Sequence, residues 1–280
     1  MKPPCDEAAI RSATSDYPCR PASGPWILAA AILGTSMAFI DSTVVNVALP
    51  ALQSSFKAGI IDVQWVVEAY GLFLGALILV GGAAGDRFGR RKVFLSGIAL
   101  FACASAACGL AQTIHQLIAA RALQGVGAAF LTPGSLAIIS ASFPEQERGR
   151  AIGTWSGFSA ITTALGPVLG GWLIQHASWR WIFFINLPLA AAVIVISMIH
   201  VPESRGPVAK RLDLLGALVV TVGLGGLVFG LIESPRLGWT NLEVSGSLLV
   251  AIACLISFPF VEARAPSPMV PLKLFRSRTF

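Results

Sequence analysis

Charged residues are scarce in this sequence: only 12% of its 280 residues are Asp, Glu, Lys or Arg. Soluble domains carry about 25%, so the chain lacks the side chains from which a water-facing surface is built. Hydrophobic residues make up 55% and are gathered in long blocks, and the two-residue alternation of a transmembrane β-barrel is absent. The composition excludes an ordinary soluble domain and favours membrane-crossing helices, because lipid offers no partner to unpaired backbone groups.

Cysteine and histidine are also few, and their positions do not match the common metal and disulfide frameworks. Two cysteines precede the first apolar block and three lie inside apolar blocks, where a thiol behaves as a small hydrophobic group. The three histidines lie at or near block ends, with no paired nucleophile or second ligand. We therefore predict that the protein is not an enzyme, with no catalytic residues, no metal site and no cofactor. The residues concerned are Cys5, Cys19, Cys103, Cys108, Cys254, His115, His176 and His200.

The N-terminal segment and the net charge narrow the class further. Residues 1–25 contain no apolar stretch of the kind found in a signal peptide, and their Pro- and Ser-rich composition predicts a disordered tail. The net charge of +6 does not indicate a nucleic-acid partner, because the basic residues lie in short loops between the apolar blocks.

The apolar blocks predict an all-α, polytopic membrane protein. About 20 apolar residues in a helix are enough to cross a hydrocarbon core of ~30 Å, and eight blocks reach about this length. They lie near 26–50, 63–85, 93–111, 115–139, 151–173, 181–200, 213–233 and 244–262.

The distribution of Lys and Arg predicts the orientation of these eight spans. Of the 20 Lys and Arg residues, only Lys57, Arg180 and Arg236 lie in the loops of one side, and Arg121 lies within a span. All the others lie on the opposite side. Because cytoplasmic loops carry the excess of positive charge, we expect both termini to lie in the cytoplasm. We expect the protein itself to lie in the cell membrane, that is, the plasma or inner membrane.

Three charged residues lie inside the predicted spans, about five or more residues from the outer ends: Asp41, Glu68 and Arg121. A charge in the bilayer costs at least about 2.5 kcal/mol unless it is paired or placed on a watery path. All three fall in the outer half of the predicted membrane, so we expect them to line one shared cavity. The alternative is a structural ion pair between Asp41 and Arg121, with Glu68 in the headgroup region.

Asp41 is the candidate proton carrier among these three. A low-dielectric setting disfavours the charged form of a carboxylate, which is the physical basis for proton uptake and release at this position. In this hypothesis Arg121 tunes the proton affinity of Asp41, and Glu68 attracts a cationic substrate.

The loop after the second block, residues 82–92, reads GAAGDRFGRRK and is called here the signature loop. We predict a tight turn between two helices, in which Gly89 lets the chain reverse and Asp86 caps or pairs locally. The cations are expected to lie against the anionic inner leaflet. The spacing G-x-x-x-D-R-x-G-x-R-K resembles the loop signature of the major facilitator superfamily. Its positions are filled by Gly82, Asp86, Arg87, Gly89, Arg91 and Lys92.

Three further segments resemble motifs of the same superfamily. Residues 121–127, RALQGVG, are similar to the motif of its proton-coupled members, with Arg121 at the buried arginine. Residues 41–50, DSTVVNVALP, resemble the signature of the fourteen-span drug:proton antiporters, and the run at 179–188, WRWIFFINLP, has the same character. The fifth block resembles the motif of the exporters, although Thr162 replaces one glycine of the longer pattern. The positions that match are Gly166, Pro167, Gly170 and Gly171.

Each motif taken alone also fits a packing role. Small residues four apart let helices approach closely, Pro50 or Pro167 ends or kinks a helix, and Trp179 and Trp181 suit the membrane interface. Four motifs in the right order on the right spans favour the family.

The resemblance implies a particular architecture. Residues 26–200 are expected to form a six-helix N-terminal bundle and 213–262 two additional transmembrane helices, joined by a cytoplasmic linker at 201–212. Residues 263–280 would lead into a next helix that this sequence lacks. The fourteen-span members carry a second six-helix bundle, so we expect that bundle as a partner, in a missing half or a separate chain.

The resemblance also implies a function: proton-coupled efflux of lipophilic or cationic small molecules. The expected partners are the substrate, protons and the lipid bilayer. Three alternatives remain open at this point. In the first, the chain is a non-transporting fragment. In the second, it is a half-transporter subunit that needs a second bundle or a second copy of itself. In the third, it is another carrier of the superfamily, for sugars or metabolites.

Overall fold

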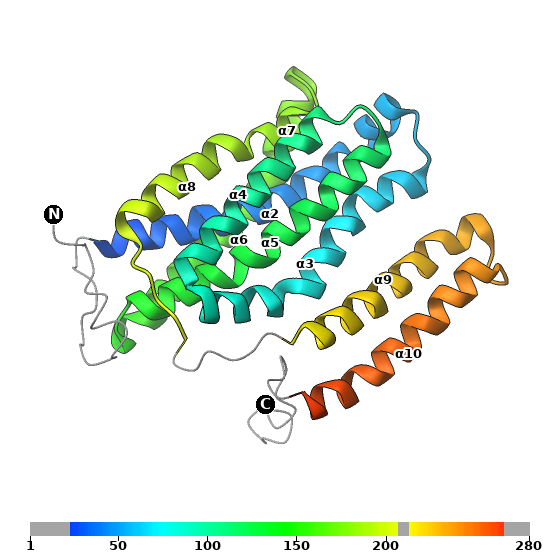
Figure 1. The fold of residues 1–280 in the computed structure, drawn as a ribbon. Helices are drawn as coiled ribbons and strands as arrows, with labels where there is room; N and C mark the ends of the chain where they lie inside the picture. The colour runs from blue at the N-terminus through cyan, green and yellow to red at the C-terminus, as the bar shows by residue number, and fades with distance from the viewer. Residues whose placement is uncertain (1–22, 207–212, 266–280) are drawn as a thin grey trace.

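The computed structural model describes residues 23–206 and 213–265. Most of the tail predicted at 1–25, the second half of the linker at 201–212 and most of 263–280 lie outside the described residues. The described residues form helices and short connections, without a strand (Figure 1). The helices are α2 (Gly24–Phe56), α3 (Ile60–Phe88), α4 (Arg90–Leu110), α5 (Ile114–Ser142), α6 (Glu145–His176), α7 (Trp181–Phe184), α8 (Asn186–His200), α9 (Leu214–Leu237) and α10 (Leu242–Arg264).

The described residues contain eight helices long and apolar enough to cross a membrane, which confirms the predicted all-α, polytopic fold. The short α7 and α8 together make one span, Trp181–His200. Several helices are longer than predicted: α2 continues past Pro50 to Phe56, so this proline does not end the span. A membrane helix tolerates proline because neighbouring groups re-satisfy the freed backbone carbonyl.

Glycines let α3 and α5 pack with their backbones in contact. A Cβ on Gly81 would collide with the carbonyl oxygen of Ala129, and one on Gly125 would collide with the carbonyl oxygen of Tyr70. Because apolar helices in lipid associate through close packing rather than through exclusion of water, these two positions set the separation of α3 from α5. Gly81 and Gly125 thereby determine the distance between the α3 backbone and the side chains of α5.

The core of the bundle consists of two apolar clusters with polar residues between them. One cluster, toward the signature loop, includes Met37, Phe94 and Phe101. The other, toward the α2–α3 turn, includes Val44 and Leu117 together with Trp179 and Phe183. Trp179 is thus a buried core residue rather than an interfacial one, whereas Trp181 is 54% exposed, as expected for an interfacial position.

The α9–α10 pair forms a hairpin that lies beside α3 (Figure 1). Trp65 on α3 donates a hydrogen bond from its indole Nε1 to Glu233 Oε1 on α9, at 2.9 Å. The Trp65 ring also packs 6.2 Å, centroid to centroid, from the ring of Phe229. Arg236 lies 3.3 Å from the second carboxylate oxygen of Glu233, so the buried acid at this junction is paired.

The contact at Gly81 predicts that two glycine substitutions on α3 differ in their effect on the free energy of unfolding. Gly81→Ala should lower the free energy of unfolding by about 1–3 kcal/mol, because the added Cβ forces two backbones apart. Gly75→Ala is the matched control, because a Cβ there meets nothing within 4 Å. Thermal unfolding of both variants in detergent micelles measures the difference. Equal midpoints would contradict the close contact between α3 and α5.

Candidate functional site

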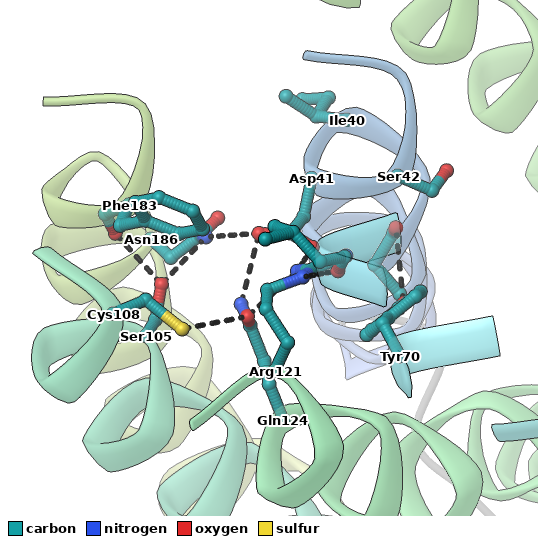
Figure 2. Close-up of polar contacts among 12 residues, drawn as sticks. Ile40, Asp41, Ser42, Tyr70, Ser105, Cys108, Arg121, Gln124, Phe183 and Asn186 are labelled. Carbon is teal, nitrogen blue, oxygen red and sulfur yellow. Dashed lines mark hydrogen bonds and ion pairs between the residues drawn. The ribbon is translucent and has the colours of Figure 1, made fainter. Parts of the chain in front are cut away.

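A buried ion pair lies at the centre of the bundle, between Asp41 on α2 and Arg121 on α5 (Figure 2). Each residue is only 1% exposed, and Arg121 Nη1 donates to Asp41 Oδ2. Two of the three predicted intramembrane charges are therefore brought together, 80 residues apart in sequence. An unpaired charge at this depth would be strongly destabilising, so each group neutralises the other.

Two amide side chains complete the shell of the Asp41 carboxylate. Gln124 Nε2 donates to Asp41 Oδ1 at 2.8 Å, and Asn186 Nδ2 donates to the same oxygen at 3.3 Å. Together with Arg121, three donors from α5 and α8 surround one carboxylate. The Asp41 side chain is therefore fixed by contacts to two other helices.

The Arg121 guanidinium has partners besides Asp41. Its Nε donates to the backbone carbonyl of Val66 on α3 at 3.1 Å, and its Nη1 donates to Gln124 Oε1 at 2.7 Å. The carbon of the guanidinium lies 4.3 Å from the centre of the Tyr70 ring, a cation–π distance. Tyr70 is held in place by donating to the carbonyl of Ala38 at 3.3 Å. The cation therefore has several contacts besides the one to Asp41.

The polar cluster extends to α4 through two small side chains. Ser105 accepts from Asn186 Nδ2 at 3.0 Å and donates to the carbonyl of Phe183 at 2.8 Å. The Cys108 thiol donates to Gln124 Oε1 at 3.6 Å. Figure 2 shows this arrangement, with contributions from α2, α4, α5 and the α7–α8 boundary around Asp41.

The helix break between α7 and α8 places Asn186 in this cluster. Residues 185–188 read INLP, and Pro188 falls in the first turn of α8, where a proline needs no hydrogen-bond partner inside the helix. The chain therefore starts a new helix at Asn186, whose side chain is fully buried. Its Oδ1 atom is buried without a hydrogen-bond partner among the described residues, so Asn186 faces the cluster with its donor end only.

Glu68 does not join this cluster through any hydrogen bond or ion pair found among the described residues. The reason is its position around the helix axis. Val66 and Tyr70, which contact Arg121, each stand two residues from Glu68 on α3, and two residues turn an α-helix by about 200°. Glu68 is half-buried on another face of α3, and that it lines one cavity with Asp41 and Arg121 stays a prediction.

The signature loop forms the predicted tight turn between α3 and α4. Gly89 adopts a φ of +115°, a conformation that favours glycine, and its N–H donates to the carbonyl of Gly85 at 3.0 Å. Asp86 pairs with Arg90 at 2.8 Å, a residue that the motif leaves unspecified. Arg91 donates from Nη1 to the carbonyl of Val201 at 3.0 Å. Of the remaining motif positions, Arg87 and Lys92 are exposed and Gly82 is half-buried.

Only some residues of the glycine motif on α6 pack closely against α2. A Cβ on Gly166 would collide with the Thr43 hydroxyl, and one on Gly170 would lie 2.9 Å from Val44. Gly171 has open space around it, and Pro167 is exposed. Thr162, at the position where the longer pattern has glycine, donates to Ser36 Oγ at 3.0 Å and so adds a polar link between α6 and α2.

Sequence reasoning did not single out several residues that the fold brings to these places. Neutral amides and hydroxyls are common in membrane spans and carry no obligatory cost there, so no role at Asp41 was assigned to them, although Gln124 lies in the motif at 121–127 and Asn186 in the run at 179–188. A weak signal existed: an amide inside an otherwise apolar run next to a proline, in INLP. The residues are Tyr70, Arg90, Ser105, Gln124, Asn186 and Glu203.

Comparison with protein families and curated proteins gives consistent results. The matching family model is described as Major Facilitator Superfamily and covers residues 31–272. The chain is 43% identical to the multidrug resistance protein Stp of Mycobacterium tuberculosis, over 89% of this chain and 46% of that protein. It is 39% identical to the tetracenomycin C resistance and export protein of Streptomyces glaucescens, over 92% and 49% of the respective chains. The chain thus spans about half the length of the curated relatives it matches.

Solved structures show the same fold at low sequence identity. A peptide transporter POT in complex with sulfate matches with a TM-score of 0.64 at 15% identity, over 93% of this chain and 56% of that chain. The human organic anion transporter MFSD10 matches with a TM-score of 0.56 at 15% identity, over 88% and 72%. At these identities the likeness describes the fold alone.

The ion pair predicts that substitutions at Asp41 and Arg121 have strongly non-additive effects on the free energy of unfolding. Arg121→Met should lower the free energy of unfolding by about 3–5 kcal/mol, because it leaves a buried, uncompensated carboxylate. The double variant Asp41→Asn/Arg121→Met should recover part of this loss. Thermal unfolding in detergent measures the cycle, with exposed Arg150→Met as the control. Additive losses in the double variant would contradict the pairing.

Proposed function

Because this chain belongs to the major facilitator superfamily, we propose that it forms the first half of a proton-coupled exporter of lipophilic or cationic small molecules. The relatives named for multidrug resistance and for tetracenomycin C resistance and export support efflux over a sugar or metabolite carrier. The observation that carries the proton-coupled part is the ion pair of Asp41 and Arg121, buried at mid-bundle among neutral polar side chains.

The proposed role of Asp41 is to exchange its contact with Arg121 for a proton. In the described conformation the Asp41 carboxyl group has three donors, from Arg121, Gln124 and Asn186. A proton on Asp41 removes the charge that balances Arg121 and leaves the cation with Gln124, Val66 and the Tyr70 ring. The two protonation states therefore favour different arrangements of α2, α5 and α8, which is the property required of a switch.

Transport by this mechanism needs a second wall facing the first bundle. The side of α6 that does not contact α2 exposes large apolar side chains along the helix, and we propose that a second six-helix bundle packs against it. That bundle is part of the same chain or a separate subunit, in which case this chain is a half-transporter. The exposed residues on α6 are Phe158, Ile161, Leu165, Val168, Leu169 and Trp172.

The proposed setting is the cell membrane, with the signature loop on the cytoplasmic side. This orientation follows from the Lys and Arg bias. It places Glu68 toward the outer side, where a half-buried carboxylate attracts cationic substrates without taking part in the Asp41 cluster.

The decisive test is uncoupler-sensitive extrusion of a fluorescent dye from an efflux-deficient host that expresses this chain, alone and together with a second bundle. Asp41→Asn should reduce extrusion at least tenfold, because an amide neither takes up a proton nor balances Arg121. Glu243→Gln, at an exposed acid on α10, serves as the matched control. Proton-coupled extrusion that persists in Asp41→Asn would rule out Asp41 as the coupling site. If the inserted wild-type chain gives no extrusion under either condition, the transport proposal fails.

Glu68 is expected to affect substrate preference rather than coupling. Glu68→Gln should raise the apparent KM for a cationic dye several-fold, because one attractive charge is lost, and leave that for a neutral substrate unchanged. The ratio of the two KM values separates this effect from a loss of expression, which lowers the maximal rate for both substrates and leaves both KM values unchanged. An equal change for both substrates would contradict an electrostatic role.

A further inference from the structure

The segment that leaves α8 lies against the signature loop. Residues 201–206, called here the strap, make two backbone–backbone hydrogen bonds and one side-chain hydrogen bond to this turn and the start of α4. Gly206 N–H donates to the carbonyl of Asp86 at 3.0 Å, and Arg90 N–H donates to the carbonyl of Ser204 at 2.8 Å. The side chain of Arg91 donates to the carbonyl of Val201 at 3.0 Å. A short connection is thus tied to a loop more than 100 residues earlier in the chain.

Glu203 in the strap occupies the N-terminal end of α4. Its Oε1 accepts from the backbone N–H of Arg91 at 3.1 Å and from that of Ser204 at 3.2 Å, and the residue is only 8% exposed. The first-turn amides of a helix need acceptors, and the N-cap residue of α4 is Gly89, which has no side chain to provide one. The carboxylate therefore caps α4 from a distant part of the sequence.

The charge of Glu203 also suits this position. The first turn of α4 contains Arg90, Arg91 and Lys92 and no acidic residue. Cations there oppose the helix dipole, whereas an anion at a helix N-terminus is stabilising. Glu203 supplies that acidic group, through its hydrogen bond from the Arg91 backbone N–H.

Gly89 leaves the space that Glu203 fills. A Cβ on Gly89 would lie 2.5 Å from Glu203 Oε1 and 2.7 Å from its carboxyl carbon. The glycine of the signature loop is therefore required twice, once for its φ of +115° and once to admit this carboxylate.

We propose that Glu203 is a positioning residue for the signature loop, acting through the Arg91 amide to fix the start of α4 and with it the Asp86–Arg90 pair. The effect of Glu203 on transport rests on the proposed function, whereas its effect on the structure of the signature loop is independent of that function. In the transporting assembly, Glu203→Ala lowers the maximal rate several-fold and leaves KM unchanged, because the loop lies apart from the Asp41 cluster.

Hydrogen–deuterium exchange on the full chain in detergent tests the positioning directly. Glu203→Ala should speed exchange of the amides at the start of α4 roughly tenfold, the size expected on losing a helix cap, with exchange in α5 unchanged. Glu203→Gln keeps an oxygen acceptor and should recover most of the protection. Glu147→Ala removes an exposed acid from the first turn of α6 and should leave α4 as in the wild type.

Two results would overturn the proposal: unchanged exchange at the start of α4 in Glu203→Ala, or no recovery in Glu203→Gln. Gly89→Ala gives a second approach, since its Cβ is directed at the same carboxylate and should speed exchange of the same amides. A chain that fails to transport but shows these exchange changes contradicts the proposed function and leaves the role of Glu203 intact.

Discussion

The interior of this bundle is organised around the need to neutralise Arg121. A guanidinium taken out of water is strongly destabilising unless its charge is balanced and its N–H groups have acceptors. The acceptors come from Asp41 on α2, from Gln124 on its own helix and from the carbonyl of Val66 on α3. The balancing acid in turn needs Asn186 from α8. Four helices are thus held in one register by a single cation, while the apolar clusters on either side impose no such directional constraint.

The end of the bundle at the signature loop presents a similar electrostatic problem in a different form. There, cations stand at the first turn of α4, where the helix dipole disfavours them, and two carboxylates oppose them. Asp86 pairs with Arg90, and Glu203 accepts from the Arg91 amide. Both balances depend on Gly89, because only a residue without a side chain allows this turn and admits Glu203. The signature loop and the strap therefore form one hydrogen-bonded unit, although they lie far apart in the sequence.

How much of this could be predicted from sequence depends on the physical signal. Length and hydropathy determine whether a segment spans a membrane, so the eight spans were predictable, and helix depth made the pairing of Asp41 with Arg121 an open alternative. Depth says nothing about direction around a helix axis, so it could not show that Glu68 makes no hydrogen bond or ion pair with Asp41 or Arg121 among the described residues; that all three line one cavity stays a prediction. Asn186 and Glu203 act through contacts with residues more than 100 positions away, and no local pattern encodes such contacts.

The position of α8 connects the two charged regions. Its first residue, Asn186, contacts Asp41, and the strap that carries Glu203 begins directly after its last residue, His200. With 15 residues, α8 is about 22 Å long at 1.5 Å per residue, and so spans the distance between the two regions. α3 provides a parallel connection, from the Val66 carbonyl at Arg121 to Asp86 in the signature loop. The Asp41–Arg121 cluster thus contacts α8 through Asn186 and α3 through the Val66 carbonyl; α3 ends at the signature loop, and α8 leads into the strap that is bonded to it. The geometry joins the mid-bundle charge pair to the α3–α4 turn without requiring any contact between them.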